Sequence, residues 1–166
     1  MRRIAVLAVL GVAFAAFVSV SNNRSTCVLV GVPRVIDGDT LAIDIEAIRL
    51  YAIDSRTLSQ LCLDRYGAAW ACGREAYSEF KRWLGKLVVT CEVVSTDSFQ
   101  RNIALCSAEG YDKGRWLVWS GFASAYVPNS KVYIHEEEAA RAKRVGVWRG
   151  AHVPPWEHRR SADGAH

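Results

Sequence analysis

Apolar residues alternate with polar ones in five short segments of the chain, a pattern typical of half-buried β-strands. These segments are residues 27–36, 40–44, 47–53, 86–95 and 102–107. Pro33 lies within the first segment and predicts an edge strand or a bulge there, because proline cannot donate a hydrogen bond to a neighbouring strand.

Three other segments show the spacing of helices. Residues 74–84 repeat apolar side chains every three or four positions, and Gly85 follows as a stop signal. Residues 112–120 precede Gly121 in the same way. Residues 135–145 begin with glutamates and end with basic side chains, an order that complements the helix dipole. These charges therefore indicate solvated, helix-stabilising positions.

The order of these elements predicts an α+β fold that is mainly β: a five-stranded barrel of the oligonucleotide- and oligosaccharide-binding (OB) type, with three helices packed on it. Residues 22–160 form a single domain in this interpretation, since a chain of 166 residues supports one core. Residues 148–160 are expected to be irregular and to pack through their aromatic side chains, and residues 161–166 to be a disordered tail. The expected assembly is a monomer.

The first 21 residues have the layout of a secretory signal peptide. Arg2 and Arg3 precede a charge-free apolar run at residues 4–20, and polar residues follow. We therefore expect an exported protein, periplasmic or secreted. Small residues near the end of the run stand only at positions 19 and 21, which makes a poor cleavage site. An uncleaved anchor is the alternative, and only in that case would the membrane be a partner.

The charge of the chain excludes strong non-specific attraction to polyanions. The formal net charge is +4 and falls to +2 without residues 1–21, because that segment holds two arginines and no Asp, Glu or Lys. A charge this small gives little general attraction to a nucleic acid or another polyanion. Any such binding must therefore come from a local patch of basic side chains.

The five cysteines fit an exported protein better than a cytosolic one. None of them lies in a Cys-x-x-Cys pair, so the pattern does not indicate a zinc or thioredoxin-like site. The simplest pairing joins Cys62 to Cys72 across one loop and Cys91 to Cys106 across two neighbouring strands, and leaves Cys27 unpaired. Spacing does not fix the connectivity, and buried free thiols are the alternative.

One predicted hairpin holds the polar side chains best placed for chemistry. Asp37, Gly38 and Asp39 form a turn, in which Asp37 is interpreted as a residue that bonds its own backbone. The flanking strands bring Asp39 and Asp54 together, and carboxylate oxygens are ligands for hard divalent cations. Arg49 would project nearby as a planar cationic fork.

Four segments of the chain resemble the thermonuclease family, the staphylococcal nuclease-like domains. They are Val-Ile-Asp-Gly-Asp-Thr at 35–40, Ile-Arg-Leu-Tyr-Ala-Ile-Asp at 48–54, Thr-Asp-Ser-Phe-Gln-Arg at 96–101 and Gly-Val-Trp at 146–148. The segments stand in family order over residues 28–156, and the first two together are a specific signal. The resemblance implies a calcium-dependent phosphodiesterase that cuts DNA and RNA, built on the predicted barrel.

The resemblance also implies roles for individual residues. The carboxylates of Asp39 and Asp54 and the backbone carbonyl of Ser55 correspond to calcium ligands. Arg49 and Arg101 correspond to the arginines that grip the scissile phosphate and stabilise its charge in the transition state.

Aromatic residues are assigned in two groups. Tyr126 corresponds to a substrate-contacting aromatic residue of the family. Most of the six tryptophans are interpreted as packing residues, although one beside the barrel face could stack a base.

The chain departs from the family pattern where the general base is expected. Thr57 stands at the position of the glutamate that activates the attacking water, and threonine cannot act as a base near neutral pH. Removal of a general base costs roughly 10²- to 10⁴-fold in rate. Gln100 stands where the family has a glycine, which would favour a tight turn. Arg56 adds a cation beside the expected metal site, which favours the binding of phosphate and disfavours the binding of calcium.

Three functions remain open on the sequence alone, of which the third is a structural or interaction protein held at the membrane by residues 4–20. The first is an exported calcium-dependent nuclease, weakened by the loss of its base. The second is a non-catalytic OB barrel that binds a polyanion or a polysaccharide. Some divergent exported relatives of the family are associated with exopolysaccharide (succinoglycan) biosynthesis, which makes an accessory protein of that process the form of this alternative.

Overall fold

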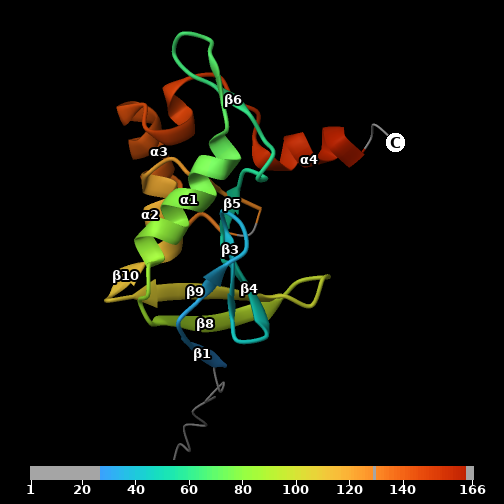
Figure 1. The fold of residues 1–166 in the computed structure, drawn as a ribbon, viewed down its shortest axis with the longest axis vertical. Coiled ribbons are helices and arrows are strands. Elements are labelled where there is room, and N and C mark those ends of the chain that lie inside the picture. The colour runs from blue at the N-terminus through green and yellow to red at the C-terminus, as the bar shows by residue number, and fades with distance from the viewer. Residues whose placement is uncertain (1–26, 129, 164–166) are drawn as a thin grey trace, which may run out of the picture.

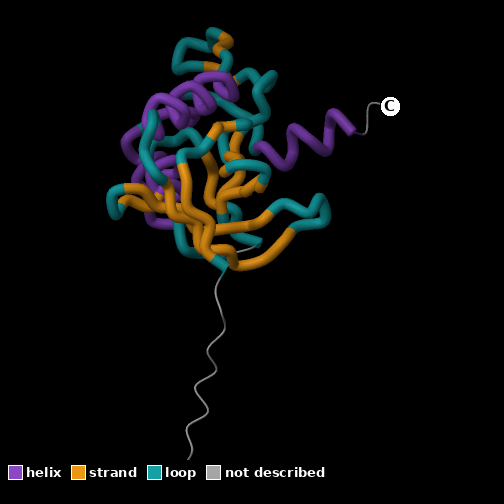
Figure 2. The backbone as a smooth tube through the Cα atoms, turned by 60° about the horizontal axis from the view of Figure 1, so that its bottom comes forward, coloured by secondary structure: helices purple, strands orange, loops and turns teal. Residues whose placement is uncertain are grey.

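The computed structural model describes residues 27–128 and 130–163. The expected signal segment at 1–21 lies outside the described residues. The described chain is an α+β fold, mainly β, as the sequence predicts: a curled sheet with helices packed beside it (Figures 1 and 2). Within these residues no helix combines the length and the apolar character needed to cross a membrane.

The main sheet curls into a half-barrel. Its strands lie in the order β1-β8-β9-β4-β3-β2, and β10 also pairs with β9. β4 and β9 pair in parallel, and the other neighbours are antiparallel. The strands are β1 (Val28–Gly31), β2 (Arg34–Val35), β3 (Thr40–Ile43), β4 (Glu46–Leu50), β8 (Val89–Thr96), β9 (Asn102–Ala108) and β10 (Tyr111–Asp112).

Two predicted strands are interrupted in the structure. The first divides into β1 and β2 on either side of residues 32–33, where Pro33 stands. The third divides into β4 and β5 (Ile53–Ser55), because Ala52 turns the chain with a φ of 59°. β5 then leaves the main sheet and pairs with β11 (Ala123–Ala125), and a small hairpin forms from β6 (Cys62–Leu63) and β7 (Ala69–Trp70).

The three predicted helices are present. They are α1 (Cys72–Leu84), α2 (Lys113–Trp119) and α3 (Ile134–Lys143). The side chain of Asp112 caps α2 by accepting a hydrogen bond from the N–H of Arg115 at 3.0 Å, so this end of the helix is fixed by the sequence itself. In Figure 1, α1, α2 and α3 gather on one side of the molecule, and α4 extends from the other side.

The prediction of an irregular C-terminal segment is wrong. A 3₁₀ turn covers Gly146–Arg149, and a fourth helix, α4, covers Pro155–Asp163, including three residues that were expected to be disordered. The prolines start this helix rather than prevent it. Pro155 stands at the first helical position, where its missing N–H costs nothing, and the carbonyl of Pro154 accepts from the N–H groups of Glu157 and His158 at 3.0 Å.

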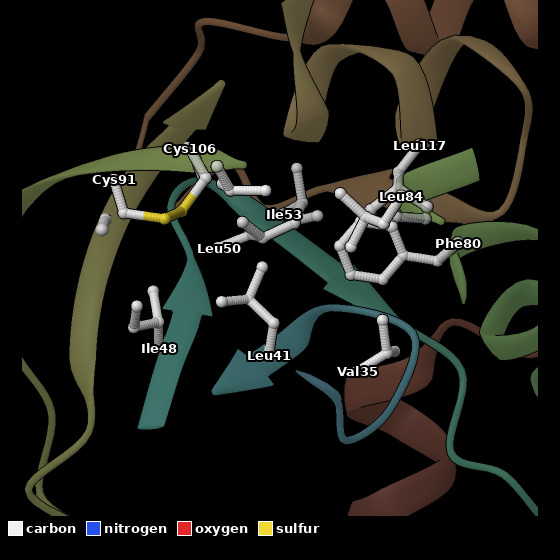
Figure 3. Close-up of a cluster of buried hydrophobic side chains, with 14 of the residues drawn as sticks. Val35, Leu41, Ile48, Leu50, Ile53, Phe80, Leu84, Cys91, Cys106 and Leu117 are labelled. Carbon is white, nitrogen blue, oxygen red and sulfur yellow. A yellow bond between two sulfur atoms is a disulfide. The ribbon is translucent and has the colours of Figure 1, made fainter. Parts of the chain in front are cut away.

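The hydrophobic core lies between the curled sheet and the first helices. Figure 3 shows Leu41, Leu50 and Ile53 from β3, β4 and β5 between Phe80 of α1 on one side and Ile48 of β4 on the other. Each of these side chains is at most 2% exposed, so the core holds β3, β4 and β5 in place. These are the strands that carry Arg49 and Asp54, and β3 begins directly after Asp39.

Two disulfides reinforce the fold, with the pairing expected from the sequence. Cys62 joins Cys72, and Cys91 of β8 joins Cys106 of β9 directly across the sheet. Both cysteines of the second bridge are buried in the core, whereas Cys27 is free and exposed.

Removal of the Cys91–Cys106 bridge is expected to lower the free energy of unfolding by about 3 kcal/mol, the value for a closed loop of this size. The double variant Cys91→Ala/Cys106→Ala would be compared with the wild type by urea denaturation. Cys27→Ser is the matched control and should change stability by less than about 0.5 kcal/mol. Equal unfolding midpoints for the double variant and the wild type would contradict this prediction.

Candidate functional site

A pocket of about 420 Å³ lies where the turn before β3, the strands β4 and β5, the β8–β9 loop and α4 meet. Six residues singled out by the sequence line it: Asp39, Arg49, Ser55, Arg56, Arg101 and Tyr126. Asp54 is fully buried directly behind Arg49. The residues of the predicted site therefore converge on one place, although Asp39 and Tyr126 are 87 positions apart in the sequence.

The turn that carries Asp39 depends on close packing against β5. The carboxylate of Asp37 accepts a hydrogen bond from the N–H of Asp39 at 3.0 Å, which is the turn role expected for Asp37. A Cβ atom on Gly38 would stand 2.1 Å from the hydroxyl oxygen of Ser55, so glycine allows the turn to reach β5. There Ser55 donates its N–H to Asp39 Oδ2 at 2.9 Å.

A network of carboxylates and guanidinium groups forms the floor of the pocket. Arg49 Nη2 lies 2.7 Å from Asp54 Oδ1 and 3.3 Å from Asp39 Oδ2, and thus bridges the two carboxylates. The second oxygen of Asp54 accepts from Arg159 Nη2 of α4 at 2.5 Å. The second oxygen of Asp39 accepts from the hydroxyl of Thr40 at 2.9 Å. Every carboxylate oxygen of Asp39 and Asp54 therefore has a donor within the chain.

Burial dominates the electrostatics of this network. Burial raises the pKa of Asp39 above its ordinary value, although the charge of Arg49 and the N–H of Ser55 oppose the shift. Burial alone would lower the pKa of Arg49, but the neighbouring carboxylates of Asp39 and Asp54 outweigh it and raise that pKa. Arg49 thus stays protonated and fixed between its two partners.

As arranged, these residues do not fit a calcium ion. Ca²⁺ takes six to eight oxygen ligands, but the guanidinium of Arg49 lies between the two expected carboxylates. Arg159 adds a second positive charge at Asp54. Across residues 27–128 and 130–163, no group of three or more His, Cys, Asp or Glu side chains is placed to hold a metal. Calcium binding stays a prediction that requires Arg49 and Arg159 to move.

The β8–β9 loop presents Arg101 through contacts made by Asp97. One oxygen of Asp97 accepts from the N–H groups of Phe99 and Arg101, and the other from Arg101 Nε at 2.8 Å. Burial alone would raise the pKa of Asp97, but these hydrogen bonds and the charge of Arg101 hold it below its ordinary value. The charged carboxylate therefore orients the guanidinium in the pocket.

Gln100 completes this loop in the left-handed conformation, with a φ of 60°. The turn that a glycine would favour is thus present in spite of the glutamine side chain, and Arg101 still lines the pocket. For a residue with a Cβ atom, this conformation costs roughly 1–2 kcal/mol.

Gln100→Gly is expected to raise the free energy of unfolding by about 1 kcal/mol, because glycine adopts positive φ without that steric cost. Thermal unfolding would measure the change. Gln100→Ala keeps the Cβ atom and should bring no such gain. A glycine variant no more stable than the alanine variant would show that the loop is not strained.

No carboxylate among the lining residues replaces the expected base. Thr57 lines the pocket, and its hydroxyl is buried without a hydrogen-bond partner among the described residues. Besides Asp39, the carboxylates that line the pocket are those of Asp37 and Asp97. Asp37 accepts from the turn, and Asp97 pairs with Arg101. The lining residues therefore do not supply the general base that the sequence lacks at Thr57.

Arg56 is the cation whose charge is least balanced by close contacts. The residue is only 1% exposed, and none of its three guanidinium nitrogens has a hydrogen-bond partner in the described chain. Burial lowers its pKa to about 10, although Glu137 and Asp54 act in the opposite direction. Arg56 thus adds a buried positive charge beside the pocket, which Glu137 and Asp54 offset in part without a hydrogen bond.

Similarity to a known protein places the chain in a family, although no family model matches it. It is 32% identical over 143 residues to succinoglycan biosynthesis protein ExoI of Rhizobium meliloti (strain 1021), an alignment that covers 84% of this chain and 75% of that protein. The chain belongs to the ExoI family. It is also 29% identical over 181 aligned positions to protein ParB of Escherichia coli, across 98% of this chain and 92% of ParB.

In this member of the ExoI family, three arginines reach the open side of the pocket. The side chains of Arg49, Arg101 and Arg159 are 22%, 27% and 39% exposed, whereas that of Asp54 is 1% exposed. Asp39 and Asp54 are buried against Arg49 and Arg159, whereas Asp37 and Asp97 line the pocket together with Phe99 and Tyr126. A ligand that enters the pocket therefore meets guanidinium N–H donors beside aromatic surface.

Sequence reasoning missed Arg159. This arginine reaches Asp54 only because α4 forms, and the segment was expected to be irregular. The available signal was the spacing of Trp156 and Arg159, three positions apart after a proline, which places both on one side of a helix. The ring of Trp156 lies 5.9 Å from that of Tyr126, so this contact helps to seat α4 beside the pocket.

Proposed function

We propose that the protein binds the acidic groups of an exopolysaccharide and serves in the production of that polymer. The observation that carries this proposal is the set of three partly exposed guanidinium groups in the pocket, each held in place by an aspartate. The succinoglycan biosynthesis protein of the same family supports the choice of a polysaccharide over other polyanions.

The chemistry of the pocket suits carboxylate, succinyl or phosphate groups. A guanidinium offers five N–H donors in a planar fork that matches two oxygens of an anion. Arg49 and Arg101 each use part of this capacity on an aspartate and keep further donors for a ligand. Because the aspartates already fix these side chains, little conformational entropy is lost when an anion binds.

Export to the periplasm or beyond is part of this proposal. The two disulfides are typical of proteins that fold in an oxidising compartment, where exopolysaccharides are also assembled or released. The basic and apolar layout of residues 1–21 provides the signal.

Binding of oligogalacturonate, an acidic decasaccharide, tests the proposal when it is compared with maltodecaose, a neutral one. Isothermal titration calorimetry on the protein without residues 1–21 in EDTA should show much tighter binding of the acidic oligomer than of the neutral one. Its affinity should fall as salt rises, since charge pairs are screened. Equal affinity for the two oligomers would contradict a guanidinium-based function, as would no binding of either.

Phosphodiester hydrolysis is a second candidate function. It is favoured by the presence of Arg49, Arg101 and Tyr126 in one pocket, as the resemblance to thermonucleases implies. Incubation with single-stranded DNA, in Ca²⁺ and in EDTA, would detect cleavage, with Arg49→Ala as the control variant. Calcium-dependent cleavage that is lost in Arg49→Ala would make this the main function. If no cleavage is detected, the binding of acidic polysaccharide groups remains the proposed function.

A further inference from the structure

A second hollow, of about 240 Å³, lies where α1, β10, α2 and α3 meet. Its wall is formed by four aromatic side chains and three charged ones: Trp83, Tyr111, Trp116, Trp119, Asp112, Arg115 and Glu136. In Figure 1, α1, α2 and β10 lie on the left of the molecule, whereas α4, which borders the guanidinium pocket, lies on the right. The two sites are therefore separate.

The aromatic side chains form a supported platform. Trp83 and Trp116 stack with their ring centroids 4.2 Å apart, and the ammonium group of Lys113 lies 3.3 Å from the centre of the Trp83 ring. These contacts fix the inner rings. Trp119 is 48% exposed and Tyr111 is 67% exposed, so large aromatic surfaces face the solvent beside the hollow.

Glu136 fixes a hydrogen-bond donor at the edge of the same hollow. Its Oε1 pairs with the guanidinium of Arg115, whose side chain is 55% exposed. The other oxygen, Oε2, is closed off from solvent and has no hydrogen-bond donor among the described residues. The guanidinium of Arg115 carries five N–H donors and keeps some of them for a ligand. This group therefore suits a ligand with hydroxyl oxygens as acceptors.

We propose that this hollow binds a neutral sugar ring of a polysaccharide chain. A pyranose has an apolar C–H face that packs on an aromatic ring and a rim of hydroxyl groups that bond carboxylates and guanidiniums. The hollow offers aromatic surface in Trp119 and Tyr111 and N–H donors in Arg115, whose guanidinium Glu136 holds in place.

The size of the hollow also favours a single ring over a protein partner. It is smaller than the roughly 300–1,000 Å³ of sites for drug-sized ligands. A stable protein interface needs about 800 Å² on each partner. The inference rests on the proposed function, because that function makes the ligand a polysaccharide. The acidic groups of the polymer bind the guanidinium pocket, whereas a neutral ring binds this second hollow.

Titration with neutral tetrasaccharides of glucose, galactose and mannose, followed by ¹H–¹⁵N NMR, tests the inference. The indole N–H signal of Trp119 should shift with at least one of them, while that of Trp156, beside the other pocket, should not. Trp119→Ala should weaken this binding about tenfold or more, because the packing surface is lost. Tyr111→Ala is a second variant, since Tyr111 is exposed and outside the core.

The outcome separates this inference from the proposed function. Arg101→Ala should leave the neutral tetrasaccharides bound, whereas Trp119→Ala should leave the binding of oligogalacturonate in the guanidinium pocket unchanged. Glu136→Gln should weaken the neutral sugars alone. The inference is overturned if no tetrasaccharide shifts the Trp119 signal, or if the affinity is the same in Trp119→Ala and Tyr111→Ala as in the wild type.

Discussion

Asp54→Asn is expected to lower the free energy of unfolding by about 1–3 kcal/mol, the cost of removing a buried hydrogen-bonding partner. Asp54 is fully buried and accepts from both Arg49 and Arg159. Asparagine keeps the shape but removes the negative charge, so Arg159 loses its counter-ion and Arg49 keeps only Asp39. Denaturation in urea would measure the loss.

Asp44→Asn is the matched control for this variant. Asp44 is exposed in the β3–β4 turn with a φ of 52°, a conformation that asparagine tolerates well. Its replacement should change stability by less than about 0.5 kcal/mol. If Asp54→Asn is as stable as Asp44→Asn, Asp54 is not the anchor of the arginine network, and the pocket described above is wrong.

Arg101→Ala is expected to weaken the binding of oligogalacturonate about 10- to 100-fold. Hydrogen bonds to charged groups contribute about 1.5–3 kcal/mol each, which corresponds to that range of affinity. Because Arg101 lies in a loop and is 27% exposed on its side chain, the fold should persist without it. Calorimetric titration of the variant and the wild type at the same salt concentration measures the change.

Arg82→Ala controls for the loss of one positive charge. Arg82 is exposed on α1, pairs with Glu79 and does not line the guanidinium pocket. The account predicts near-normal affinity for this variant. Equal losses in Arg82→Ala and Arg101→Ala would mean that net charge rather than the pocket determines binding.

The central part of the fold was predictable because its pattern is local. Alternating apolar residues around Leu41 and Ile48 place β3 and β4, and the helical spacing at residues 74–84 places α1. The turn at Asp37 and Asp39 follows from turn chemistry. These local rules were enough to bring Asp39 and Arg49 together.

The parts that could not be predicted depend on contacts between distant segments. β11 is the tripeptide Ala-Ser-Ala, which shows no strand pattern and forms because β5 pairs with it across about 70 residues. The contact of Arg159 with Asp54 joins residues 105 positions apart. Residues 148–160 were expected to be irregular, although Pro155 stands at the first position of α4, where proline is a common start.

The same distant contacts change the interpretation of the site. The sequence placed two carboxylates and Arg49 together and indicated a metal centre. The structure adds Arg159 and places Arg49 between the carboxylates, so the arrangement is a set of oriented guanidinium groups.

The most direct test of the central claim is NMR of the arginine side chains during titration with oligogalacturonate in EDTA. The account predicts that the Nε–H signals of Arg49, Arg101 and Arg159 shift together and saturate at one affinity, while that of Arg82 stays in place. Maltodecaose should leave all four unchanged. The claim is contradicted if the three pocket signals do not move, or if they move equally with the neutral oligomer.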